Sequence, residues 1–190
     1  MDSYLVVDVE ATTPSPMTGV MTEMGVVDLA TRDYAYLHFY DFTPHPDIPA
    51  LPVVEADAEP NLYSFTGTFD GARHDGAPVE HLSHVSALSA LSGWIVQISG
   101  RRRVTFVSDN PGYDFMWTTC AFDAAGLKSP FGHSSRRIGD LAAGLAGKWL
   151  QTSSWKRLRD VNHSHDPVDD AQGNAGALLA LLRAHSQPTP

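Results

Sequence analysis

The strongest constraint on the fold is a short run of apolar, mostly β-branched residues near the N-terminus. Residues 4–9 read Tyr-Leu-Val-Val-Asp-Val, and such a run predicts a strand that is buried on both faces. A strand of this kind belongs to a sheet that other elements cover on each side. The run carries an acidic residue, Asp8, at the point where the predicted core gives way to solvent.

The rest of the chain predicts an α/β fold. Residues 21–29 and 34–42 have the pattern of two more strands, and the short connections predict an antiparallel meander. A further buried strand is expected at 104–107. Helical spacing, a Pro at 111 and a Gly at 126 predict helices at 85–99, 111–125, 137–148 and 168–185. The predicted architecture is a mixed sheet, a three-strand antiparallel meander plus parallel strands, with flanking helices.

Residues 43–84 show no clear periodicity. The segment is rich in proline, acidic and small residues, and so long a connection within a compact domain is usually functional. Two interpretations stay open, the wall of a substrate groove or a variable surface excursion. The length of 190 residues fits a single domain, residues 1–190, with a loop-rich insert at about 43–84.

Composition narrows the class of protein. The net charge of −9 argues against a protein that coats nucleic acid through a broad basic face. It leaves room for an enzyme that holds only the end of a strand. One cysteine, Cys120, cannot form an internal disulfide. The N-terminus lacks the pattern of a signal peptide, and no segment has the ~20 apolar residues of a membrane span. We therefore expect a cytoplasmic protein with no membrane partner.

The first candidate site is the pair Asp8 and Glu10. Side chains two apart on a strand point to the same face, so both carboxylates project together. Two like charges held side by side repel each other, and a cation between them removes that cost. Oxygen ligands favour Mg²⁺ or Mn²⁺. The pair taken alone is also consistent with two charged residues that simply leave a strand.

Two other acidic positions lie at junctions between elements. Asp114 falls in the first turn of the helix after the 104–107 strand and is favoured over Asp109, which is also suited to capping or ligation. Asp170 falls in the first turn of the last helix, with four residues between it and His165, and Asp166 or Asp169 is suited to capping that helix. His165 is favoured over His163 because of its spacing to Asp170.

The three elements together resemble a known family. Asp8-x-Glu10, Asn110-x-x-Tyr113-Asp114 and His165-x₄-Asp170 are similar to the three motifs of the DEDDh 3′→5′ exonucleases, which have an RNase H-like fold. Residues 22–27 resemble the second strand of that family, and the resemblance extends from residue 4 to about 183. The nearest likeness is to small bacterial and phage 3′→5′ exoribonucleases. The Ala at position 11 departs from the usual Asp-x-Glu-Thr, so Thr12 or Thr13 is expected to take the threonine's place.

The resemblance implies a mechanism and a set of site residues. Asp8, Glu10, Asp114 and Asp170 would hold two divalent cations, Mg²⁺ or Mn²⁺, for phosphodiester hydrolysis. His165 would be the general base, because histidine exchanges its proton near neutral pH. The expected substrate is the 3′ end of single-stranded RNA or an RNA overhang. The residues expected to contact it are Ala11, Thr12, Thr13, Met24, Tyr113 and Arg157, with Lys156 and Arg159 near upstream phosphates.

Three alternatives accompany this interpretation. The first is a 3′→5′ DNA exonuclease of the proofreading or repair type, since RNA preference requires a polar contact to the terminal 2′-OH. The second is a catalytically inactive module that only binds nucleic acid, which the complete carboxylate set disfavours. The third is a metal phosphoesterase of unrelated fold, for which more histidine or cysteine ligands are expected. The resemblance also suggests a homodimer.

Overall fold

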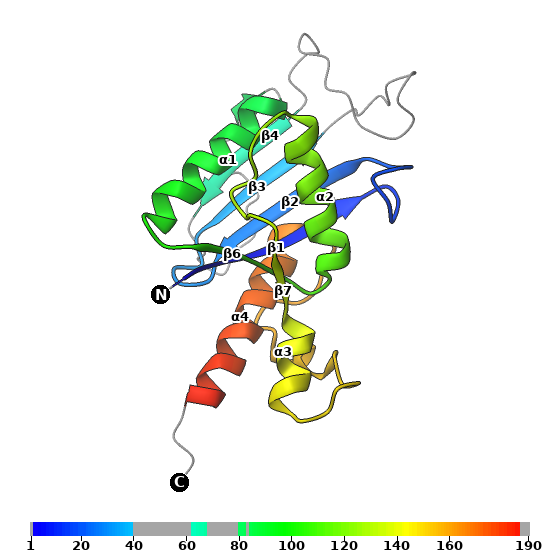
Figure 1. Cartoon of the computed structure of the whole chain (residues 1–190), viewed down its shortest axis with the longest axis vertical. Helices are drawn as coiled ribbons and strands as arrows, with labels where there is room; N and C mark the ends of the chain where they lie inside the picture. Colours follow the sequence, from blue (N-terminus) through cyan, green and yellow to red (C-terminus); the bar gives the residue numbers. More distant parts are fainter. Residues whose placement is uncertain (1, 40–61, 68–79, 83, 187–190) are drawn as a thin grey trace.

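The computed structural model describes residues 2–39, 62–67, 80–82 and 84–186. These residues form a mixed sheet of seven strands in the order β5-β4-β3-β2-β1-β6-β7 (Figure 1). The strands are β1 (Ser3–Ala11), β2 (Met21–Asp28), β3 (Tyr34–Phe39), β4 (Leu62–Gly67), β5 (Glu80–Leu82), β6 (Val104–Ser108) and β7 (Ser135–Arg137). The helices are α1 (His84–Ser99), α2 (Pro111–Ala124), α3 (Ile138–Leu145) and α4 (Pro167–Ser186), with a 3₁₀ helix η1 (Ser154–Leu158).

Strand β1 lies inside the sheet, between an antiparallel and a parallel neighbour. It pairs antiparallel with β2, which continues through β3 and β4 to β5, and it pairs parallel with β6, which pairs parallel with β7. The predicted meander with added parallel strands is therefore confirmed. Because β1 and β6 are parallel, their C-terminal ends meet at one edge of the sheet, where Asp8 and Asp109 lie.

Two apolar cores cover the two faces of the sheet, which explains why β1 reads as a continuous apolar run. Leu5 and Val7 of β1 pack in a cluster with residues of α1 and α2. Val6 points the other way, into a cluster with residues of α3, η1 and α4. Figure 1 shows α1 and α2 in front of the sheet and α4 reaching it from behind. Asp8 and Glu10 have the same parity as Val6, so they project to the side of α4.

A glycine fixes how closely α4 approaches the sheet. Gly25 is the β2 partner of Asp8, and a Cβ at this position would lie 2.5 Å from the carbonyl carbon of Pro167 and 2.7 Å from the nitrogen of Val168. Only glycine leaves room for the first turn of α4 against β2. This close approach brings Asp170, in the same first turn, next to the end of β1.

The structure departs from the sequence-based expectations in three places. The helix predicted at 137–148 is shorter, and residues 135–137 before it form the edge strand β7. The 3₁₀ helix η1 was not predicted; Trp155 buries its ring there. Within the expected insert at 43–84, strands β4 and β5 extend the sheet beyond β3, and the remainder lies outside the described residues, as do positions 40–42 of the predicted third strand.

Among the helices in the described part of the chain, none combines the length with the apolarity that a membrane crossing requires.

Candidate metal centre and catalytic cleft

Three carboxylates converge at the C-terminal end of β1. Asp8 and Glu10 come from the strand and Asp170 from the first turn of α4, and one ligand oxygen from each lies within 4.8 Å of the others. Such a cluster of hard oxygen donors has the composition of a Mg²⁺ or Mn²⁺ site. Asp170 is only 2% exposed, so its negative charge is held where water cannot disperse it.

Asp114 approaches the same carboxylates from α2. It is 4% exposed, and its Oδ2 accepts a hydrogen bond of 3.3 Å from the backbone N–H of Asn110. Burial raises the pKa of Asp114 to about 7. Asp114 stands outside the three-oxygen group, yet after burial its charge is the largest influence on the pKa of Asp8. The four predicted acids thus form one electrostatic unit.

The pKa values of the two carboxyl groups of β1, Asp8 and Glu10, are both raised. Burial raises the pKa of Asp8 well above its usual value, and the charges of Asp114, Asp170 and Glu10 raise it further. Burial also raises the pKa of Glu10, which the nearby His165 partly offsets. A site that penalises its own ionised carboxylates is stabilised by cations, because positive charge favours the ionised form of every member.

A cleft of about 490 Å³ opens over the carboxylates. Its lining comes from β1, the β6–α2 connection, α2, η1 and the segment after it, and the start of α4. The lining residues are Asp8, Val9, Glu10, Asp109, Asn110, Tyr113, Asp114, Lys156, Arg159, His163 and Asp170. The cleft therefore combines an acidic floor with two cationic side chains. That pairing suits a substrate that is itself anionic and that reacts at a metal centre.

Asp109 holds the two cations of the cleft. Its Oδ2 lies 2.5 Å from Lys156 Nζ and 3.7 Å from Arg159 Nη2. Arg159 is further fixed by two hydrogen bonds to Asn174 Oδ1, at 3.0 and 2.7 Å. Asp109 is thus paired with two cationic side chains.

The segment before α4 places two histidines beside the carboxylates. His165 has a positive φ of 61°, and its Nδ1 lies 3.9 Å from Glu10 Oε1 while 78% of its side chain is exposed. A non-glycine residue in this conformation costs free energy and commonly marks a functional segment. The ring of His163 lies 4.3 Å away, centroid to centroid.

His163 lies closer to the carboxylates than its spacing suggested. Its Nδ1 is 2.6 Å from Asp170 Oδ2, and it lines the cleft. The chain bends at His165, between His163 and Asp170, and a residue seven positions before Asp170 lies in contact with it. Asp166 ends the segment as the cap of α4, because its Oδ1 accepts the N–H groups of Val168 and Asp169. Of the two capping candidates, the structure identifies Asp166.

The predicted substrate contacts near the end of β1 have different surroundings. Tyr113 lines the cleft near the backbone of Ala11. Thr12 lies at the start of the β1–β2 turn, where its Oγ1 accepts the N–H of Val20. The Oγ1 of its neighbour Thr13 donates to the carbonyl of Ser15.

Met24 and Arg157 are placed away from the cleft. Met24 is completely buried in the core between the sheet and α1 and α2, which removes it from the expected nucleotide contacts. Arg157 lines a separate groove with Leu158 and Leu181. The cleft instead receives Lys156 and Arg159, which stand three positions apart, the repeat of a 3₁₀ helix. Lys156 lies within η1 and Arg159 directly follows it, next to the buried Trp155.

Comparison with known proteins places the fold. No family model matches the chain, and neither does any curated protein sequence. The nuclease domain of 3′hExo, a DEDDh family member bound to rAMP, matches with a TM-score of 0.57 and 11% sequence identity over 96% of this chain and 92% of that one. This likeness shows that the chain shares the fold of that domain, the RNase H-like fold that the sequence resemblance implied.

Two structures of a larger protein also match. The zinc-bound E. coli ExoI–ssDNA complex gives a TM-score of 0.49 and 15% identity over 99% of this chain. An ExoI/SSB-Ct complex gives 0.43 and 12% over 99%. The present chain spans only 41% and 42% of the length of those two chains.

Proposed function

We propose that the chain is a metal-dependent 3′→5′ exonuclease that removes nucleotides from the 3′ end of single-stranded RNA. The observation that carries the proposal is the convergence of Asp8, Glu10 and Asp170 within 4.8 Å, with buried Asp114 beside them, under a cleft that also holds two cations. The 3′ polarity is supported by the resemblance of the three motifs to the DEDDh family and by the fold shared with a DEDDh nuclease domain.

The residues present fit divalent cations. The donors are carboxylate oxygens, and the raised pKa of both Asp8 and Asp114 shows that their ionised forms lack compensation from the protein alone. Asp8, Glu10, Asp114 and Asp170 would hold two ions, Mg²⁺ or Mn²⁺. When bound, two such ions supply a more acidic water and stabilise charge on the leaving oxygen.

Residues of the chain itself would bind the substrate phosphate, accept a proton from the attacking water and position the metal ligands. Lys156 and Arg159 are held at the cleft by Asp109 and offer positive charge to the phosphate that enters. His165, 3.9 Å from Glu10, is the proposed general base that accepts a proton from the attacking water. His163 holds Asp170 in place through its 2.6 Å contact. Tyr113 borders the cleft and is suited to packing against the terminal nucleotide.

The cleft fits the end of a strand rather than a duplex. Its volume of about 490 Å³ falls within the range of sites for single small ligands. The net charge of −9 opposes broad binding to a polyanion, so binding is confined to local positive charge. The proposal further expects a cytoplasmic location and a homodimer, which cell fractionation and sedimentation would test.

Degradation of end-labelled oligonucleotides tests the proposal. A single-stranded RNA labelled at its 5′ end should give a ladder that shortens by one nucleotide per step in Mg²⁺ or Mn²⁺, and EDTA should stop the reaction. The same RNA labelled at its 3′ end should release labelled mononucleotide at once. Loss from the 5′ end, or full activity in EDTA, would refute the mechanism. Faster hydrolysis of a DNA strand of equal sequence would refute the RNA preference and favour a DNA exonuclease.

A further inference from the structure

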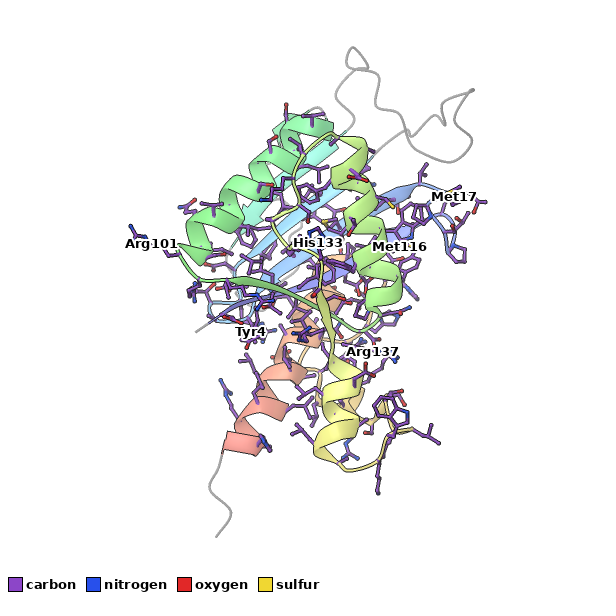
Figure 2. The ribbon with its side chains drawn as sticks, viewed as in Figure 1. Tyr4, Met17, Arg101, Met116, His133 and Arg137 are labelled. Atoms are coloured by element: carbon purple, nitrogen blue, oxygen red, sulfur yellow. The ribbon has the colours of Figure 1, made fainter. Side chains whose placement is uncertain are left out.

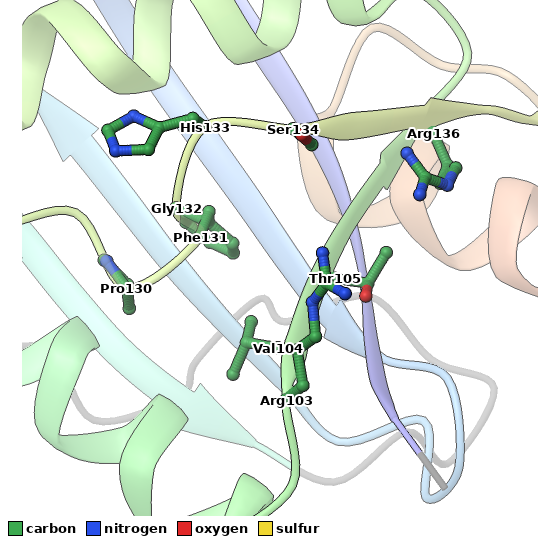
Figure 3. A pocket seen from close by; sticks show the side chains of 9 residues that line it. All are labelled: Arg103, Val104, Thr105, Pro130, Phe131, Gly132, His133, Ser134 and Arg136. Carbon is green, nitrogen blue, oxygen red and sulfur yellow. The ribbon is translucent and has the colours of Figure 1, made fainter.

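A second pocket lies at the edge of the sheet, away from the carboxylates. It has a volume of about 210 Å³ and is formed by the start of β6 and by the loop at 130–134 that leads into β7 (Figure 3). Pairing between β6 and β7 begins at Phe106, so β7 does not cover the preceding residues of β6. The loop borders this uncovered edge, and the pocket is the space between them.

The lining of the pocket is basic and hydroxylated. Arg103, Arg136 and His133 line it together with the hydroxyl residues Thr105 and Ser134, and none of the nine lining residues is acidic. Figure 3 shows the Arg103 guanidinium beside Thr105, with the Arg136 side chain across from it. Two guanidiniums directed at one space repel each other unless an anion lies between them.

Three arginines elsewhere in the described residues form ion pairs, and the two arginines of this pocket do not. Arg32, Arg137 and Arg159 each form an ion pair with an aspartate. Within the described residues, neither Arg103 nor Arg136 has such a pair, and the Arg136 guanidinium donates only to the carbonyl of its own neighbour, Ser135. Both are therefore available to bind an external anion.

The three consecutive arginines at 101–103 have different surroundings. The guanidinium of Arg102 donates to the carbonyls of Ser99 and Ile98, at the C-terminus of α1. Arg101 projects from the edge of the molecule, away from His133 (Figure 2), and does not line the pocket. Of the three, Arg103 alone faces the loop. Arg101 is thus a control of equal charge, two positions away.

Strand β7 links the pocket to the cleft. Arg136 pairs with Val107 and Arg137 with Ser108, and Arg137 Nε donates to the carbonyl of Asp109, a cleft residue, at 3.0 Å. From Thr105 to Asp109 the chain advances four residues, or about 13 Å along a strand. A strand that keeps helical stacking advances about 3.4 Å per nucleotide, so a stacked strand would cover this distance with about four nucleotides.

We propose that this pocket binds a backbone phosphate of the strand whose 3′ end occupies the cleft, about four nucleotides upstream. The proposal rests on the function proposed above, since it takes the cleft as the site of the 3′ end. Guanidinium groups bind phosphate oxygens through paired, charge-assisted hydrogen bonds, and the hydroxyls of Thr105 and Ser134 are further donors. The substrate would then be an oligonucleotide of at least five nucleotides rather than a dinucleotide.

Binding measurements test the pocket independently of turnover. Fluorescence anisotropy of an eight-nucleotide RNA in Mn²⁺ and low salt would compare three proteins, each carrying His165→Ala to slow hydrolysis. These are the otherwise wild-type chain, Arg103→Ala/Arg136→Ala and Arg101→Ala. We expect the double variant to bind about tenfold more weakly, and the slope of its salt dependence to fall by about 0.7 for each phosphate that is no longer neutralised. Arg101→Ala should resemble the wild type. The melting temperature should be unchanged, because both pocket arginines are exposed.

Single neutral linkages locate the phosphate. In a series of RNAs, each with one methylphosphonate at a different linkage, affinity for the wild type should fall mainly near the fourth linkage from the 3′ end. For the double variant, affinity should not depend on the position of the methylphosphonate. An equal loss with Arg101→Ala, or a flat profile for the wild type, would overturn the proposal. Millimolar inorganic phosphate offers a further test. If phosphate protects the pocket arginines from chemical modification but does not weaken RNA binding, the pocket binds phosphate without contacting RNA, and the proposal is wrong. If the protein binds RNA with this profile but hydrolyses no RNA or DNA, the proposed phosphate site stands and the proposed exonuclease activity is wrong.

Discussion

The substitution Gly25→Ala should disable the site without touching a carboxylate. The new Cβ would lie 2.5 Å from the carbonyl carbon of Pro167, whereas ordinary contacts begin at 3.4 Å, so the first turn of α4 must move by about 1 Å. Asp170 moves with that turn, away from Asp8. A displacement of this size in a reacting geometry typically costs about 100-fold in rate. Overpacking should also reduce the free energy of unfolding by about 1–3 kcal/mol.

The assay separates misplacement from unfolding. Single-turnover hydrolysis and Mn²⁺ titration would be measured at a temperature at which circular dichroism shows both proteins folded. A loss of about 1 kcal/mol lowers the melting temperature by about 2–4 °C in a chain of this size, so the variant should still fold. Gly93→Ala is the matched control, because nothing lies within 4 Å of a Cβ at that helical position. A Gly25→Ala protein with wild-type turnover and Mn²⁺ affinity would refute the role of α4 docking.

Three further predictions concern the cleft. His165→Ala should lower the rate of hydrolysis by about 10²–10⁴-fold with little change in Mn²⁺ affinity, whereas His163→Ala should mainly weaken Mn²⁺ binding because His163 contacts Asp170. Calorimetric Mn²⁺ titrations and rate measurements on both variants distinguish the two effects, and the opposite result would exchange the proposed roles of the two histidines. In EDTA, the free energy of unfolding should fall as pH rises from about 4 to about 7. In that range the folded state binds more protons than the unfolded state, because folding raises the pKa of Asp114 from 3.8 to about 7. Thermal melts at several pH values test this, and added Mn²⁺ should reverse the decline. Lys156→Ala should raise KM and leave kcat largely intact if Lys156 binds substrate phosphate, while Arg157→Ala, in a separate groove, should change neither; equal effects of both substitutions would contradict the assignment.

The sequence predicted what depends on periodicity and on position along the chain. The strand at 4–9, the helices that begin near 111 and 168, and the convergence of Asp8 with Asp170 all follow from side-chain alternation and from element ends. Asp114 was predicted over Asp109 as a metal ligand from its place in the first turn of the helix. The structure shows Asp109 paired with Lys156 and Arg159 instead, and the choice of ligand stays a prediction.

What the sequence missed depends on packing between distant segments or on rare backbone conformations. Strand β7 has three residues, two of them exposed arginines, and so carries no apolar signal. The contact of His163 with Asp170 spans a bend at His165, whose φ is positive, and no pattern in the sequence marks that conformation. The burial of Met24 depends on the packing of α1 and α2 over β2, and the separation of Arg157 from Lys156 depends on the phase of η1 around Trp155.

The acidic character of the chain follows from the same chemistry as its proposed activity. Two divalent ions would bring the net charge from −9 to −5, by the addition of four positive charges. Because Asp8 and Asp114 have raised pKa values, binding of these ions must displace protons, and metal affinity must rise with pH. The carboxylates that destabilise the metal-free protein near neutral pH are therefore the ones that bind cations most strongly there. A phosphodiester is attracted only where those cations, Lys156 and Arg159 offset the surrounding negative charge, which confines the reaction to the cleft.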